Sequence, residues 1–280
     1  MVIRRRSLPP GWYPSGRGEI VRRIEEFLKA SPEPSPPACA AVAPHAGWEF
    51  SGRIACRALR CLPSDTETVV VVGGHLGQGE GVLAAFEQGY ETPLGAVEAD
   101  LELLEALRGR LEVSEDRYAD NTVEIQLPFL RHLLPRARGL ALRASPSQAA
   151  LRLGEALAAC ARETRRRTAV VGSTDLTHYG PNYGFSPRGS GTEAVKWVRE
   201  VNDRRLVEAL LGLQLEQALE LAHREHSACS AGGAVAAARF ARELGCARGE
   251  LLEYATSHDV YPGSSFVGYA AIIYPEVAAR

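Results

Sequence analysis

Thr68-Val69-Val70-Val71-Val72-Gly73-Gly74-His75 is the stretch of sequence that decides the fold. Four consecutive valines that end in two glycines predict a strand buried on both faces, as in a parallel sheet covered by helices. A histidine follows at the carboxyl end of this strand, where ligands of open parallel sheets bind. The stretch therefore predicts both an architecture and the edge of the sheet at which a site would lie.

On either side of this stretch, predicted strands alternate with predicted helices. The remaining strands are expected at 39–43, 81–86, 140–144, 168–172, 251–256 and 266–274. The helices are expected at 20–28, 51–62, 99–107, 123–134, 148–163, 192–211, 215–225 and 232–244. This alternation predicts an α/β fold with a largely parallel central sheet and helices on both faces.

Length and composition narrow the class of protein. The chain has 280 residues, which suits one α/β domain spanning 1–280. It carries 32 basic and 34 acidic residues, and this balance disfavours a dedicated nucleic-acid binder. No apolar run approaches the roughly 18 to 20 residues that a membrane span needs, and no apolar stretch follows the basic start. We therefore expect a cytoplasmic protein with no membrane or nucleic-acid partner.

Histidines follow several predicted strands. His45 and His75 each come directly after a strand, and Asp175 and His178 come after another. Because the carboxyl ends of parallel strands meet at one edge, these side chains are expected to converge. Any one of them alone would more often be a hydrogen-bonded loop residue, and Asp175 could equally cap a turn. Imidazoles with a carboxylate suit Fe(II), Zn(II), Cu(II) or Ni(II) rather than Mg²⁺ or Ca²⁺.

Cys229 stands apart from the other cysteines because it lies in a small-residue loop before a predicted helix. A helix N-terminus lowers a thiol pKa, so this residue could bind a metal or act as a nucleophile. The alternative is a buried cysteine that packs as a small apolar residue. That alternative is expected for the remaining cysteines, none of which forms a C-x-x-C pair: Cys39, Cys56, Cys61, Cys160 and Cys246.

Other polar residues keep two interpretations. Asp120 or Asn121 is expected to cap the following helix, with a place in the pocket, together with Glu124, as the alternative. His132 and His223 are predicted to be surface residues of helices. His226 and His258 could be either surface or site residues.

Several motifs along the chain resemble the Memo-like family, also called the AmmeMemoRadiSam system protein B family. The motifs occur in the family's order and cover nearly the whole chain. They are Gly11-Trp12-Tyr13-Pro14, Pro44-His45-Ala46-Gly47-Trp48, Gly73-Gly74-His75, Thr92-Pro93-Leu94-Gly95, Glu124 to Phe129, Ser173 to Gly180, Tyr254 to Ser257 and Val267 to Ala270.

The resemblance implies a fold similar to the class III extradiol dioxygenases, which use non-heme Fe(II). By the same resemblance, His45, His75 and Cys229 occupy metal-ligand positions, and Asp175 and His178 are the catalytic candidates in the same pocket. Fe(II) is the metal expected first, with Cu or Zn as alternatives. The dioxygenases have a glutamate where this family has the cysteine, so ring cleavage does not follow from the fold.

This chain also departs from the family's own pattern. Asp120-Asn121-Thr122 replaces the usual E-H-S, and Ser257-His258-Asp259 replaces S-G-D, which could add the His258 imidazole to the pocket. Three functions remain open: a metal-dependent oxidoreductase of unknown substrate, a non-catalytic iron- or copper-binding protein, and a phosphopeptide-binding adaptor. The family name further implies radical-SAM and AMMECR1-type proteins as pathway partners.

Overall fold

The computed structural model describes residues 2–30, 36–118 and 120–277. Its strands are β1 (Ile3–Arg4), β2 (Ala38–Ala43), β3 (Thr68–Gly73), β4 (Val82–Ala84), β5 (Gly89–Tyr90), β6 (Val97–Glu98), β7 (Ser114–Glu115), β8 (Arg138–Ala144), β9 (Thr168–Ser173), β10 (His178–Tyr179), β11 (Glu250–Thr256) and β12 (Phe266–Pro275). Its α-helices are α1 (Arg17–Ala30), α2 (Arg53–Leu59), α3 (Leu101–Arg108), α4 (Asn121–Glu124), α5 (Leu127–Leu133), α6 (Gln148–Thr164), α7 (Thr192–Trp197), α8 (Asp203–Leu211), α9 (Leu215–Glu225) and α10 (Ala231–Glu243). Wider or tighter helical turns cover Trp48–Gly52, Pro181–Tyr183, Val198–Asn202 and Ser257–Asp259.

The main sheet has a parallel centre and antiparallel edges. Its strands lie in the order β10-β12-β2-β9-β3-β8-β4-β7, and β11 also pairs with β12. The neighbours β2, β9, β3 and β8 are parallel, whereas β12 runs antiparallel to β2 and β4 runs antiparallel to β8. The predicted α/β class with a largely parallel sheet is confirmed. The direction of the edge strands could not be predicted from an apolar run, because both directions bury the same residues.

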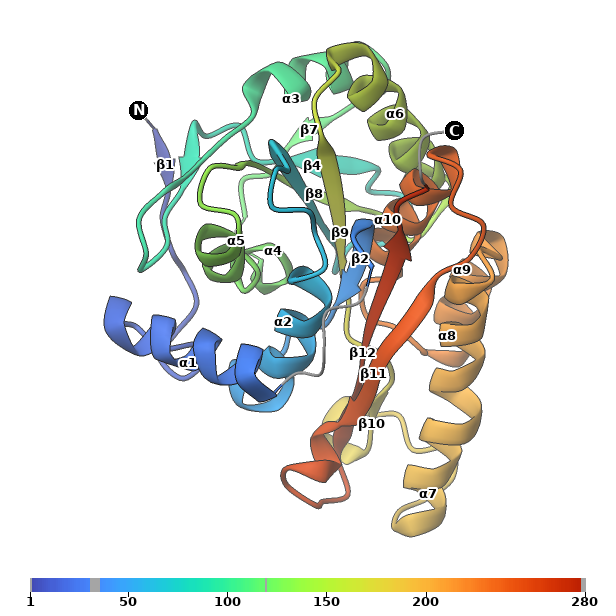
Figure 1. The fold of residues 1–280 in the computed structure, drawn as a ribbon. Helices are drawn as coiled ribbons and strands as arrows, with labels where there is room; N and C mark the ends of the chain where they lie inside the picture. The colour runs from blue at the N-terminus through green and yellow to red at the C-terminus, as the bar shows by residue number, and fades with distance from the viewer. Residues whose placement is uncertain (1, 31–35, 119, 278–280) are drawn as a thin grey trace.

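The valine run explains why helices cover both faces of the sheet. Val70 and Val72 belong to one buried cluster, with side chains from α3, α6, α8, α9 and α10. Val69 and Val71 belong to another, with side chains from α1, α2 and α5. Successive side chains of a strand point to opposite faces, so each face needs its own helical layer. Figure 1 shows these two groups of helices on opposite sides of the sheet.

Three predicted helices are shorter or interrupted, and the one expected at 192–211 is divided into α7 and α8 by the wider turn Val198–Asn202. The helix expected at 123–134 is divided into α4 and α5, with Gln126 between them donating to the Pro44 carbonyl at 2.8 Å. The helix expected at 51–62 begins in the wider turn Trp48–Gly52 and ends at Leu59. Apolar spacing alone cannot detect such a break, because the period continues through it.

Small residues allow α10 to lie directly on the sheet. The helix packs against β2, β3 and β9. A Cβ atom on Gly233 would come closer to the Val72 carbonyl oxygen than real Cβ atoms do, and one on Gly232 would meet the Ala144 carbonyl oxygen. The close contact places the start of α10, and Cys229 before it, at the carboxyl ends of the central strands.

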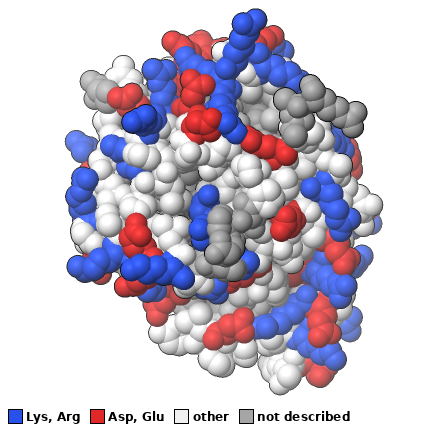
Figure 2. Space-filling model, in the orientation of Figure 1, with Lys and Arg blue, Asp and Glu red and all other residues white. Residues whose placement is uncertain are grey.

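Charged side chains of both signs are mixed on the face of the molecule seen in Figure 2. Lys and Arg side chains lie beside Asp and Glu there, with uncharged surface between these groups. Within the described residues, no helix combines the length and apolar character that crossing a bilayer requires.

Candidate metal centre

Three side chains from distant parts of the sequence meet at the carboxyl edge of the sheet. His45 follows β2, His75 follows β3, and Cys229 precedes α10. One donor atom from each lies within 4.8 Å of the others. The Cys229 sulfur is 3.2 Å from His45 Nε2, and the two imidazole rings lie edge to face at 5.1 Å. The convergence expected from the strand ends is therefore present.

His45 is held as a neutral imidazole. It is 1% exposed, and its Nδ1 lies 3.3 Å from the Ser173 hydroxyl. Burial, with a smaller effect from the neighbouring His75, lowers the pKa of His45 to about 3. A neutral ring keeps one nitrogen lone pair, and a metal ion requires that lone pair. The Nε2 atom that faces Cys229 is the nitrogen available for this role.

His75 is held from behind by Asp120. Its Nδ1 lies 3.1 Å from Asp120 Oδ2, and its backbone is in the left-handed region with a φ of 58°. Asp120 also caps α4, because its other oxygen accepts from the Thr122 backbone N–H at 2.9 Å. Burial raises the pKa of Asp120, but the hydrogen bonds from His75 and Thr122 outweigh it and lower the pKa overall. Asp120 therefore fills both predicted roles: it caps the helix and it lies at the site.

Arg143 and Asp116 form a buried ion pair beside Asp120 that the sequence did not predict. Arg143 of β8 is 6% exposed and donates to both oxygens of the buried Asp116, at 2.9 and 2.7 Å. Its Nη1 lies 3.7 Å from Asp120 Oδ2. A single arginine in an apolar strand carries no spacing signal, so this support could not have been inferred from the sequence.

The expected lowering of the Cys229 pKa is wrong. Burial, with a further contribution from Asp175, raises the pKa of this thiol well above its ordinary value. Ser230 separates Cys229 from the first residue of α10, and the Cys229 backbone N–H donates to the Asp175 carbonyl at 3.3 Å. Without a cation beside it, the residue is a thiol; a bound metal ion would favour the thiolate.

Asp175 and His178 lie against the same three side chains. Asp175 is 3% exposed; its Oδ1 accepts from the His45 backbone N–H at 2.7 Å, and its Oδ2 lies 3.9 Å from His178 Nε2. Burial raises the pKa of Asp175 to about 6. Burial also lowers the pKa of His178, whose Nε2 is buried with no hydrogen-bond partner among the described residues. His178 therefore has an unused nitrogen beside the centre.

The loop that carries His178 is fixed from below by Asp203. This residue is fully buried, accepts from the Thr177 backbone N–H at 3.0 Å, and accepts from the Tyr254 hydroxyl at 2.7 Å. Burial raises the pKa of Asp203 to about 6. It lies within the predicted helix 192–211, where nothing distinguishes it from a surface acid.

A pocket of about 500 Å³ opens over the centre. Its walls are aromatic, polar and histidine side chains, and among the described residues that line it none is Lys or Arg. The lining residues are Trp12, His45, Ala46, Gly47, Phe50, His75, Asn121, Asp175, His178, Tyr183, Ser257, Tyr261, Ser265, Val267 and Tyr269. Asn121 thus takes the pocket position that was the alternative to a cap.

The remaining histidines and acids lie outside this pocket. His258 bonds to Gly263 and packs against Phe266 instead of adding its imidazole to the pocket. His226 is exposed at the end of α9. His223 is exposed on α9 and His132 bonds to Glu25 on the surface, as predicted. Glu124 accepts from Tyr13 and Ser7 away from the centre.

The five other cysteines are buried, as predicted.

The family model and the relatives that this chain matches belong to the same family. The family described as Memo-like protein matches residues 4–273. A MEMO1 family protein from Methanopyrus kandleri is 33% identical over 94% of this chain and 95% of the relative. Another from Pyrococcus abyssi is 32% identical over 97% and 99%. Among solved structures, an uncharacterized protein from Escherichia coli K12 has a TM-score of 0.49 and 14% identity, covering 83% of this chain and 98% of that one.

Proposed function

The chain belongs to the Memo-like family, and from this premise we propose that it binds Fe(II) through His45, His75 and Cys229 and acts on a small molecule in the adjoining pocket. The observation that carries the proposal is the meeting of three donor atoms within 4.8 Å from three separate segments.

The donor set fits a transition metal. Imidazole nitrogens and a sulfur suit iron, copper or zinc, whereas Mg²⁺ and Ca²⁺ prefer oxygen ligands. The partners of both rings also fit, because metal-bound histidines usually donate their second N–H to an oxygen. The oxygen beside His45 is the Ser173 hydroxyl, and the oxygen beside His75 belongs to the Asp120 carboxylate. When bound, Fe(II) would supply one-electron chemistry and polarise a coordinated group.

His178 and Asp175 are the residues to which we assign proton handling. His178 lines the pocket, and its Nε2 has no hydrogen-bond partner among the described residues, so it would accept or return a proton of a bound molecule. Asp175 holds the loop of His45 through the backbone and lies beside His178, so it orients both. Trp12, Phe50 and Tyr261 would supply aromatic surface for the apolar part of that molecule.

The two alternative functions account for fewer features of the pocket. A non-catalytic iron- or copper-binding protein would need the same ligands but neither the pocket nor the unpaired nitrogen of His178. A phosphopeptide adaptor would need cationic partners for the phosphate, and arginine clusters usually supply them. The described lining contains no such side chain.

The test is the metal content of anaerobically purified protein, measured by elemental analysis. We expect about one iron per chain, and near-complete loss in His45→Ala, because a buried ligand is removed. His132→Ala, a surface histidine paired with Glu25, is the matched control and should retain the metal. Metal-free protein that takes up neither Fe(II), copper nor zinc would overturn the proposal.

A further inference from the structure

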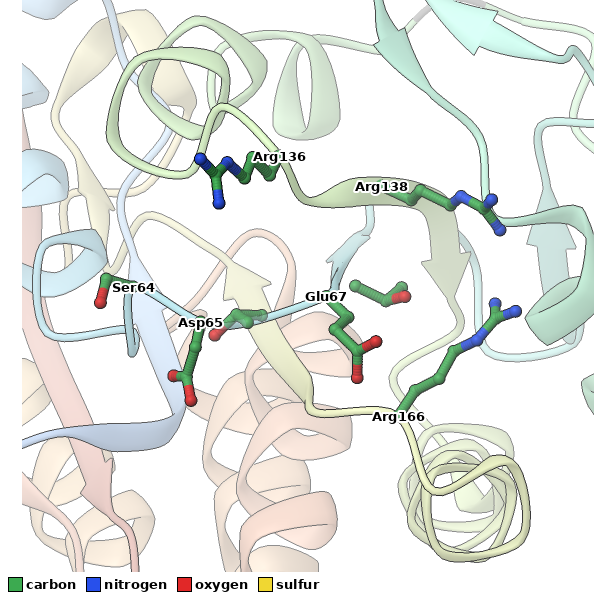
Figure 3. Close-up of a pocket in the computed structure, with 8 residues that line it drawn as sticks. Ser64, Asp65, Glu67, Arg136, Arg138 and Arg166 are labelled. Carbon is green, nitrogen blue, oxygen red and sulfur yellow. The ribbon is translucent and has the colours of Figure 1, made fainter.

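A second pocket lies at the opposite, amino-terminal edge of the sheet. The segments before β3, β8 and β9 enclose about 500 Å³, and the lining includes Thr66, Arg136, Arg138 and Arg166. These three strands are neighbours in the order β9-β3-β8, so their amino ends converge as their carboxyl ends do. Figure 3 shows the arginine side chains and Glu67 around this space.

Two of the three arginines, Arg136 and Arg138, have unused hydrogen-bonding capacity. The side chains of Arg136 and Arg138 are exposed and make no ion pair or hydrogen bond with any described residue. Arg166 is held by two acids: it donates to the two oxygens of Asp100 at 2.7 and 2.8 Å, and its other terminal nitrogen pairs with Glu102. Its guanidinium and that of Arg138 are turned to the same side of the pocket in Figure 3. Arg166 is therefore already paired, and the guanidinium groups of Arg136 and Arg138 remain available.

The acids near these arginines already have partners. Asp65 forms an ion pair with Arg167. One oxygen of Glu67 accepts from the Arg167 backbone N–H at 2.9 Å. The buried Asp100 accepts from Thr68 as well as from Arg166. These contacts leave the guanidinium groups of Arg136 and Arg138 as charges that a ligand could neutralise.

Thr66 is an independent indication of a ligand. It is 4% exposed, lines the pocket, and its hydroxyl is buried with no hydrogen-bond partner among the described residues. Leaving a buried hydroxyl unpaired is unfavourable, so such groups usually have a partner. A ligand oxygen in the pocket would supply that partner.

We propose that this second pocket, the arginine pocket, binds a small phosphorylated metabolite. The guanidinium group of Arg138 would take the phosphate, because a planar N–H fork matches its several oxygens, and the Thr66 hydroxyl would donate to it. Arg136, whose guanidinium is turned to the other side of the pocket in Figure 3, would add its positive charge. The volume exceeds what a phosphate group needs and is within the range of small-molecule sites. The remaining space would hold the organic part.

The first test is calorimetric titration of the purified protein with inorganic phosphate at low ionic strength. We expect saturable binding that weakens about tenfold or more in the double variant Arg136→Gln/Arg138→Gln, because charge-assisted hydrogen bonds are lost. The control Arg22→Gln/Arg248→Gln removes two exposed arginines elsewhere and should bind normally. Unsaturable binding, or equal binding by the first double variant, would overturn the proposal.

Two further variants separate this pocket from the metal centre and from simple charge attraction. His45→Ala should bind phosphate as the wild type does; loss of binding there would place the phosphate at the metal and overturn the proposal. Thr66→Val should fold normally, because the hydroxyl has no partner to lose. We expect it to weaken phosphate binding about threefold or more; unchanged affinity would contradict the role of Thr66.

Discussion

The carboxyl and amino edges of the same central strands differ in burial, and the difference determines their chemistry. At the carboxyl edge, His45 and Asp175 are almost completely buried, so the imidazole is neutral and the carboxyl group has a raised pKa. At the amino edge, Arg136 and Arg138 are exposed and keep their charge. One sheet thus offers lone pairs to a cation at one edge and cations to an anion at the other.

The largest expected effect is on stability, from substitutions that disturb packing at each edge. Gly233→Ala would press a methyl group against the Val72 carbonyl at the carboxyl edge, and neither backbone can yield easily. We expect it to lower the free energy of unfolding by at least about 3 kcal/mol, measured by urea denaturation.

The matched control for this packing test lies near the amino edge. In Gly139→Ala the added methyl group would lie 2.9 Å from Cγ1 of Val97, a side chain that can shift. We expect a loss of about 1 to 2 kcal/mol. Equal losses for the two variants would mean that the carboxyl edge is no more tightly packed than the amino edge.

The pH dependence of stability sharpens the comparison, because Asp203 is an acid buried beneath the carboxyl edge. Its folded pKa of about 6 is above the ordinary 3.8, so the folded state holds a proton that the unfolded state loses first. Asp203 should therefore contribute about 3 kcal/mol of stability at pH 4 that is lost as pH rises from 4 to 6.

Asp203→Asn removes the titrating group while keeping the shape of the side chain. Its unfolding free energy, relative to the wild type, should rise by about 3 kcal/mol between pH 4 and 7 in urea denaturation. A difference that stays constant across this range would show that Asp203 is ionised in both states.

The smallest effect is expected from the residue that supports His75. Asp120→Asn keeps a side chain that can cap α4 but removes the charged acceptor of the His75 N–H. Metal affinity should fall by about 10- to 100-fold, measured by competition with a chromophoric chelator. Asp65→Asn, an acid at the amino edge, should leave the affinity unchanged.

The sequence predicted the strand ends better than the supports behind them. The valine run predicted β3. Because His45, His75, Asp175 and His178 each follow a predicted strand, they were expected at one edge of the sheet, and they lie together there. Arg143 and Asp203 were missed because their burial depends on tertiary packing, which a single charged residue in a strand or helix does not reveal.

The thiol of Cys229 shows a second kind of limit. The position of Cys229 before α10 suggested a lowered thiol pKa, whereas burial raises that pKa. A helix terminus is a local feature that a sequence displays, while desolvation depends on every segment that packs around the group. His258 illustrates the same limit, since its loop turns the ring toward Gly263 and Phe266.

The order of the three candidate metal-binding residues along the chain has a consequence for biosynthesis. A ribosome that has translated the first 200 residues has supplied both histidines but not Cys229, and strand β12, which pairs with β2, comes later still. The complete centre can therefore assemble only near the end of translation. A prematurely terminated polypeptide would carry two imidazoles without their sulfur partner and without the strand that completes the sheet beside them.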